Sequence, residues 1–212
     1  MRRVFSWTSV FLSMLALLLV LPAATEAWNT GEEIRRLNKE VPSIEGFSGA
    51  ASVVWLKNND FRMLNDGTME NTHYYVVLAG EYIPEQVKEI RLPVPPEGSV
   101  EILEASWYNP MTSMKEGDLS LSEEKLDGGA AVKKVITPDE AVGRVIVLIV
   151  RTKHEKRYGV DETIDMAGPL PIWEQNVTES FRKEGNSTGT EGISRTLWSQ
   201  NRPDSRNSNG QL

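Results

Sequence analysis

Apolar and polar residues alternate with the two-residue period of a β-strand over most of the chain beyond Gly49. Turn-forming residues interrupt this alternation roughly every ten positions, a spacing typical of sandwiches and barrels. The segments that we predict to be strands are residues 50–56, 61–64, 68–78, 87–94, 100–108, 119–126, 130–136, 145–150 and 171–178. The pattern therefore predicts an all-β fold, an antiparallel β-sandwich over residues 49–178.

Two turns in this pattern predict β-hairpins. Asn65-Asp66-Gly67 lies between two strand segments, and its Asp-Gly pair tolerates the positive φ angles of a tight turn. Asp127-Gly128-Gly129 separates another pair of segments in the same way. Pro95-Pro96-Glu97-Gly98 and Lys115-Glu116-Gly117-Asp118 are also predicted to be turns.

The same pattern predicts which residues are buried. Residues 145–150 are all aliphatic, which indicates a central strand buried on both faces. In the strand predicted at 68–78, we expect the core face to be the one that carries Thr72, Tyr74, Val76 and Leu78. The opposite face carries Asn71, His73, Tyr75 and Val77. In the last strand, Trp173 and Val177 should share one face.

A short helix is predicted before the first strand, within a lead-in at residues 28–48. Thr30 and Glu33 have the spacing of a capping box, in which each side chain accepts a free backbone N–H at the helix start. Ile34, Leu37 and Val41 then fall on one helical face. We expect a helix over residues 31–40 that packs on the domain, with binding of a partner as the alternative.

The first 27 residues have the features of a secretory signal peptide. Arg2 and Arg3 are followed by the almost continuously apolar residues 10–21, and Pro22 ends this run. Small residues precede a cleavage position after Ala27. An uncleaved membrane anchor is the alternative, but a spanning helix needs about 20 apolar residues and this run is shorter. The sequence therefore predicts export to the periplasm or the extracellular space, without a membrane span after cleavage.

Composition and charge exclude several classes of function. The chain has no cysteine, so it forms no disulfide, uses no thiolate nucleophile and carries no bacterial lipid anchor on cysteine. Its formal net charge is −7, and the acidic excess lies in residues 28–178. Nucleic acids and anionic membranes bind positive surfaces, so neither is an expected partner. The one basic run, residues 151–157, is expected to be a solvated strand end, with an anion-binding patch as the alternative.

The candidate catalytic and metal-binding residues do not form a recognised site. His73 and His154 are the two histidines, and neither has metal-ligand spacing or a nucleophile beside it in the sequence. Residues 46–49, Gly-Phe-Ser-Gly, match only part of a nucleophile elbow, because Ala50 replaces its final glycine. We therefore predict no catalytic residue, no metal site and no cofactor.

Two further groups could bind ligands without catalysis. Asp161, Glu162 and Asp165 form the densest acidic cluster, but they lack the order of an EF-hand and are expected to be a solvated loop. Trp55, Trp107 and Trp173 lie in predicted strands and are expected to pack in the core. If they were exposed on one sandwich face, they would suit a sugar or a peptide.

Several motifs resemble the bacterial family known as domain of unknown function 3857. The resemblance lies in residues 60–70 (DFRMLNDGTME), 76–80 (VVLAG) and 102–110 (ILEASWYNP), and in the stretch 161–177 with its Gly-Pro-Leu-Pro step. It covers about residues 49–178. The resemblance implies an exported β-sandwich that often precedes a transglutaminase-like cysteine-enzyme domain and has no assigned activity of its own. It transfers no catalytic residue to this chain.

The chain departs from this resemblance after Thr178, where the family continues into a further strand and turn. Residues 179–212 are instead rich in Ser, Asn, Gly and Thr, so we predict a disordered or weakly attached tail. One hypothesis is that a frame change near Glu179 produced the tail. The next reading frame of the gene tests it, because a continued strand and a longer open frame should appear there.

These observations favour a non-catalytic, exported module with a recognition or accessory role in the cell envelope. The expected partner is a protein or a glycan of the envelope, or a transglutaminase-like domain. The alternative is the N-terminal remnant of a transglutaminase-like cysteine enzyme that lacks its catalytic domain.

Overall fold

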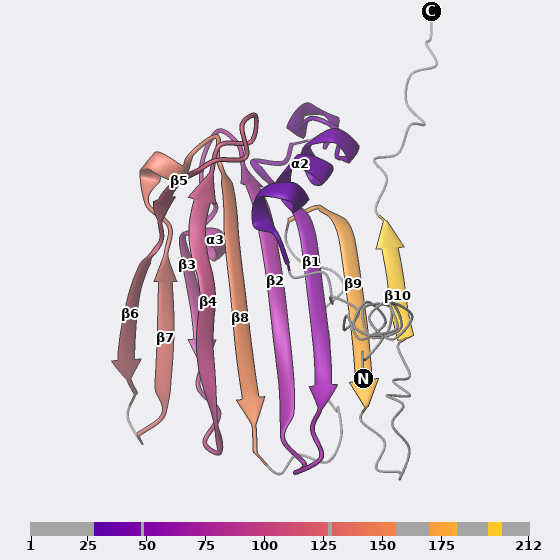
Figure 1. The fold of residues 1–212 in the computed structure, drawn as a ribbon. Helices are drawn as coiled ribbons and strands as arrows, with labels where there is room; N and C mark the ends of the chain where they lie inside the picture. Colours follow the sequence, from indigo (N-terminus) through magenta and orange to yellow (C-terminus); the bar gives the residue numbers. More distant parts are fainter. Residues whose placement is uncertain (1–27, 48, 127–128, 156–169, 182–194, 201–212) are drawn as a thin grey trace, which may run out of the picture.

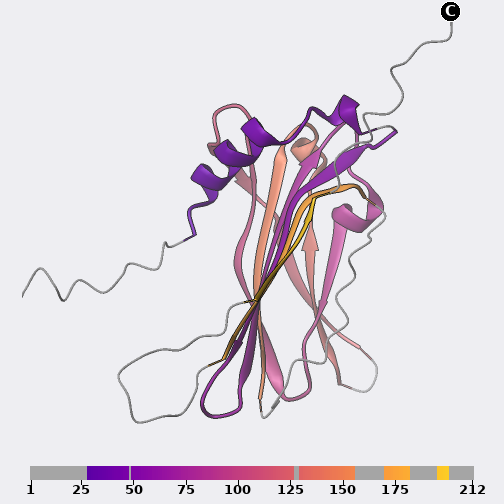
Figure 2. The ribbon, with the colours of Figure 1, turned by 90° about the vertical axis from the view of Figure 1, so that its right-hand side faces the viewer.

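The computed structural model describes residues 28–47, 49–126, 129–155, 170–181 and 195–200. Within these residues two β-sheets pack face to face, and a helix covers the outer face of the larger sheet (Figures 1 and 2). The prediction of an all-β sandwich with a short N-terminal helix is confirmed. In the described part of the chain, no helix is both long and apolar enough to cross a membrane.

Sheet A has seven strands and sheet B has three. The order in sheet A is β10 (Arg195–Gln200), β9 (Ile172–Phe181), β1 (Ser52–Met63), β2 (Met69–Ala79), β8 (Val145–His154), β4 (Gly98–Tyr108) and β5 (Lys115–Asp118). The order in sheet B is β3 (Glu89–Pro93), β7 (Ala131–Ile136) and β6 (Ser120–Lys125). The remaining elements are α2 (Thr30–Glu40), η1 (Ile44–Gly46), α3 (Glu85–Lys88) and η2 (Asp139–Ala141).

One strand pair departs from the predicted antiparallel arrangement. β9 lies parallel to β1, with Ile172 beside Val54 and Val177 beside Asn59. The pair is parallel because β8 ends at one end of the sheet and β9 begins at the other end. Strand patterns along the chain do not contain this information, since pairing direction depends on how distant segments connect.

Sheet A is buried on both faces, as β8 shows most directly. Residues 145–150 of β8 are all buried, which confirms that this strand is central. One face packs against sheet B, where Val77 and Leu148 join Val135 in one apolar cluster. The other face packs under α2, where Val76 contacts a cluster that includes Ile34. The predicted core face of β2 therefore faces the helix, and the core of the sandwich lies on the opposite face.

The β1–β2 hairpin has the predicted turn. Gly67 has φ +82°, and Leu64 donates its N–H to the Thr68 carbonyl at 2.8 Å. The two segments predicted before this turn are one continuous strand, β1, which bends at a bulge between Val54 and Leu56. The β6–β7 hairpin is also present; Gly129 has φ +86°, and residues 127 and 128 lie outside the described residues.

The predicted turn at Lys115–Asp118 is wrong, because these residues form β5. The chain reverses earlier, at residues 109–114. The Asn109 backbone N–H donates to the Met114 carbonyl, and the Asn109 side chain accepts the N–H groups of Met111 and Thr112 at 2.9 and 3.1 Å. An Asn side chain that bonds nearby backbone can define a turn in this way.

The helix forms where predicted, but its start differs. Asn29 is the N-cap and accepts the Glu32 N–H at 3.2 Å, so the capping box is wrong. Thr30 instead donates to Glu104 on β4, and Glu33 pairs with Arg36. An Asn one position earlier is as good a cap as Thr, which explains the shift. Ile34 and Leu37 of the predicted stripe are both 0% exposed.

The sequence predicts a cleaved signal peptide at the N-terminus and a disordered or weakly attached tail at residues 179–212. The signal peptide and its cleavage after Ala27 lie outside the described residues. The prediction of an unstructured tail is wrong for part of it, because β9 continues to Phe181 and β10 pairs with β9 at Arg195–Gln200. The free edge of β9 offers backbone groups that any extended segment can pair with, whatever its composition. Residues 182–194 and 201–212 are not described.

Candidate binding groove at the open flank of the sandwich

Two strand edges remain unpaired on one flank of the described sandwich. β5 pairs only with Ser106–Tyr108 of β4, so no described strand adjoins the outer edge of residues 98–104. β6 is the last strand of sheet B, and its outer edge is equally free. Unpaired strand edges present backbone N–H and C=O groups that another extended chain can bind.

The chain itself holds these two edges apart. β5 belongs to sheet A and β6 to sheet B, and only Leu119 separates them. Leu119 donates its N–H to the Ala105 carbonyl at 3.0 Å, and its side chain is 4% exposed. Because the chain changes sheets at this anchored residue, the two sheets are joined beside Leu119. Farther along β4 and β6 their edges are separate.

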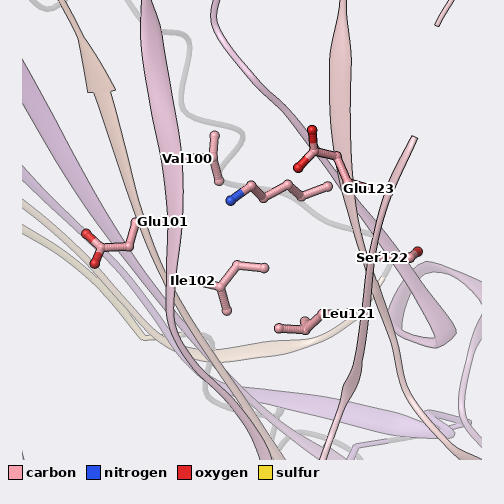
Figure 3. Close-up of a pocket in the computed structure, with 7 residues that line it drawn as sticks. Val100, Glu101, Ile102, Leu121, Ser122 and Glu123 are labelled. Carbon is pink, nitrogen blue, oxygen red and sulfur yellow. The ribbon is translucent and has the colours of Figure 1, made fainter. Parts of the chain in front are cut away.

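A groove of about 500 Å³ lies between the two edges (Figure 3). Its lining residues are Val100, Glu101, Ile102, Leu121, Ser122, Glu123 and Lys133. Ile102 and Leu121 face each other across it. Leu121 is 55% exposed although it is apolar, in a strand that is otherwise polar. The groove therefore has an apolar floor that is open to solvent.

Three of the seven residues that line the groove are charged, namely Glu101, Glu123 and Lys133. Glu123 and Lys133 are direct cross-strand partners in β6 and β7. Glu101 points away from the floor, and its carboxylate lies 3.5 Å from the Arg151 guanidinium on the opposite face of sheet A. It therefore contributes its backbone to the groove. Such exposed ion pairs stabilise a fold little, so their main effect is on which ligands can approach the groove.

The predicted site residues are not assembled here. His73 lies on β2, where its Nδ1 is 2.6 Å from the Asn59 side-chain oxygen. Burial, and then the charge of Lys57, lower the pKa of His73 from 6.5 to about 4, so this imidazole is neutral at neutral pH. His154 lies at the end of β8 opposite Met69, four residues from His73 along β2. Neither histidine lines the groove.

The other candidates have structural positions or lie outside the described residues. Trp55 is 3% exposed, and Trp107 and Trp173 are half-buried against the two main clusters, so the predicted core role is confirmed. Trp173 and Val177 belong to different clusters, so the prediction that they share one face is wrong. Residues 44–46 form η1, and Ser48 is not described. The acidic cluster at 161, 162 and 165 also lies outside the described residues. Where side chains are described, no group of three or more His, Asp or Glu could hold a metal ion.

One polar cluster was not anticipated from the sequence. Glu104 of β4 accepts the Thr30 hydroxyl at 2.6 Å and also the Tyr108 hydroxyl. Burial and the bond to Glu104 both raise the pKa of Tyr108. Trp28 donates its indole N–H to Thr30 at 2.9 Å. Because these groups satisfy one another, the cluster fastens α2 to β4 and has a structural role.

The comparisons with known proteins bear on the fold alone. No protein-family model and no curated protein matches the sequence. The crystal structure of a candidate protease from Parabacteroides distasonis is similar, with a TM-score of 0.59 and 12% identity over 74% of this chain. This chain spans 37% of that protein. An M1 zinc metallopeptidase from Deinococcus radiodurans has a TM-score of 0.36 at 13% identity, over 71% of this chain and 39% of the other, too low to support an argument.

Proposed function

We propose that the protein is a non-catalytic recognition module that binds an extended polypeptide segment at the groove between β4 and β6. The observation that carries the proposal is an apolar floor between two unpaired strand edges. A segment added beside β4 would bond to the free backbone groups of residues 98–104. Strand addition of this kind takes its affinity from backbone bonds and its specificity from alternate side chains.

The groove also defines the expected chemistry of the segment. Alternate side chains of an added strand would point at Val100, Ile102 and Leu121, so they should be apolar. The remaining side chains would face solvent near the surface of a chain whose formal net charge is −7. Basic residues at those positions would increase the rate of association.

A synthetic octapeptide that alternates valine with lysine or threonine tests the proposal. We expect titration of the ¹⁵N-labelled protein to shift the amide resonances of residues 100–103 and of Leu121. A peptide of the same composition whose valines are contiguous should bind at least fivefold more weakly, because it cannot place alternate side chains in the groove. Equal binding of the two peptides would reduce the interaction to charge attraction and contradict the proposal.

Two substitutions on the same hairpin sharpen this test. Leu121→Lys should weaken peptide binding about tenfold or more, because it places a charge on the apolar floor. Leu126→Lys is the matched control, since Leu126 is 41% exposed and does not line the groove. If both variants bind like the wild type, the groove is not the site.

We also propose that the module is exported and works in the cell envelope, as the leader-like first 27 residues suggest. A second candidate is that it is the N-terminal remnant of a transglutaminase-like cysteine enzyme. The fold similarity to a candidate protease of which this chain spans 37% supports that candidate. The downstream DNA separates the two: an uninterrupted frame that encodes a cysteine-enzyme domain supports the second, and its absence supports the first. Analysis of the N-terminus of the secreted protein tests cleavage after Ala27.

A further inference from the structure

A second opening lies at the other edge of sheet B, between β3 and the inner face of β2 and β8. A cavity of about 370 Å³ is lined by Asn71, His73, Tyr75, Gln86, Ile90, Leu92, Leu148, Val150 and Thr152. A cavity of about 530 Å³ shares Asn71, Leu92 and Thr152 with it and extends to the β3–β4 turn. The two cavities therefore form one elongated cleft, which we call the inter-sheet cleft. Val100 borders both this cleft and the groove.

The walls of the inter-sheet cleft are mostly apolar, and they include the imidazoles of His73 and His154. Ile90 and Leu92 of β3 face Leu148 and Val150 of β8. The described residues that line the two cavities include no Asp, Glu, Lys or Arg. Ligand sites of this size are commonly apolar with a few polar groups that orient the ligand.

The polar groups of the cleft include one buried acceptor without a donor, the side-chain oxygen of Asn71, and the imidazole of His73. The Asn71 side-chain oxygen, which borders both cavities, is buried and has no hydrogen-bond partner among the described residues. The His73 Nδ1 must carry the ring proton, because it lies 2.6 Å from the Asn59 amide oxygen, which can only accept. Nε2 of the neutral ring is then an acceptor as well. A buried acceptor normally has a donor, so Asn71 Oδ1 indicates a missing one.

We infer that the inter-sheet cleft binds an uncharged, elongated apolar molecule with a hydroxyl group, of the class of long-chain alcohols. The chain would lie between the apolar walls of β3 and β8, where burial stabilises it. The hydroxyl would donate to Asn71 Oδ1 or His73 Nε2. A carboxylate of the same length would be buried without a lysine or arginine in the lining, which is unfavourable. Lys57 lies close enough to act on His73 but is not part of the lining.

Calorimetric titration with 1-decanol and with decanoate tests the inference on the unmodified protein. We expect 1-decanol to bind at least tenfold more tightly than decanoate, since the two differ only in the charge of the head group. Decanoate binding as tightly as the alcohol would overturn the inferred neutral ligand. Absence of heat and of chemical-shift changes with 1-decanol would overturn the site itself.

Three variants locate the binding. Ile90→Trp should fill the cleft and weaken decanol binding more than tenfold, whereas Leu121→Trp, in the groove, should leave it unchanged. Asn71→Val removes one acceptor and should weaken binding about three- to tenfold, the usual effect of one neutral hydrogen bond. Circular dichroism checks that each variant is folded. Loss of binding in Leu121→Trp, or none in Ile90→Trp and Asn71→Val, would refute the placement. The peptide experiment on the groove is unaffected by either outcome.

Discussion

The two edges of sheet B differ in how they meet sheet A. At the β6 edge the strands separate, and the groove exposes an apolar floor with Glu123 and Lys133 beside it. At the β3 edge the sheets converge on neutral residues around Asn71 and His73. The groove lies where both sheets end, whereas the inter-sheet cleft lies where the three strands of sheet B stop and the seven-stranded sheet A continues. Their lining decides their chemistry: backbone pairing suits the first, and burial of an uncharged molecule suits the second.

Truncation of an apolar side chain at each opening should give the largest difference in unfolding free energy between the two openings. Leu148→Ala removes a side chain that is 2% exposed and borders the inter-sheet cleft, so we expect a loss of about 2–5 kcal/mol of unfolding free energy. Leu121→Ala removes one that is 55% exposed in the groove, and the change should stay within about 0.5 kcal/mol. Denaturant unfolding measures both. Equal losses would mean that the groove is as closed as the cleft.

His73, which lines the inter-sheet cleft, should contribute to the pH dependence of stability. The pKa of His73 falls from 6.5 to about 4 on folding, so the unfolded chain binds the proton more readily. The stability from neutral His73 is complete above pH 6.5 and is lost as the pH falls toward 4, by about 2–3 kcal/mol. His73→Asn keeps an N–H donor for Asn59 but does not titrate.

Unfolding free energies of the wild type and of His73→Asn at pH 7 and pH 4 measure this contribution. We expect the wild type to lose about 2–3 kcal/mol more than the variant over this range, since the carboxylates titrate in both proteins. Parallel losses would show that His73 is accessible to protons in the folded state.

A side chain at Gly117 of β5 should lower the stability of the fold. A Cβ there would lie 2.6 Å from the Trp107 ring, which packs against the core between the sheets. We expect Gly117→Ala to cost about 1–3 kcal/mol, because the ring must move away from its contacts. Thermal unfolding measures this cost. A rise in stability would contradict the close stacking of β5 on Trp107.

Local features of this fold were predictable, because they depend on residues close in sequence. The alternation identified nearly all strands, the aliphatic run identified β8 as central, and Gly67 identified the first hairpin. Errors occurred where neighbours in space decide. Lys115–Asp118 forms a strand because β4 lies beside it, and Arg195–Gln200 pairs with β9 although it lies in a tail rich in Ser, Asn, Gly and Thr. The face of β2 that carries Tyr74, Val76 and Leu78 was predicted to be the core face, but it packs under α2. The opposite face packs against sheet B, and the sequence does not show that both faces are covered.

Neither candidate site could be derived from the sequence. Leu121, an apolar residue in a polar strand, is the one local signal for the groove, and nothing local relates it to Ile102. Asn71 and His73 lie in a largely polar stretch of β2, and no local pattern distinguishes them from other strand residues.

The sequence alone determined the class of the fold, the central strand, the first helix and the absence of cysteine chemistry, since composition and short-range periodicity specify these. Tertiary structure decided the parallel β1–β9 pair, the two-sided burial of sheet A and both openings. These depend on long-range register and on how far one sheet extends over another, and residues far apart in the chain share no local pattern that encodes such contacts.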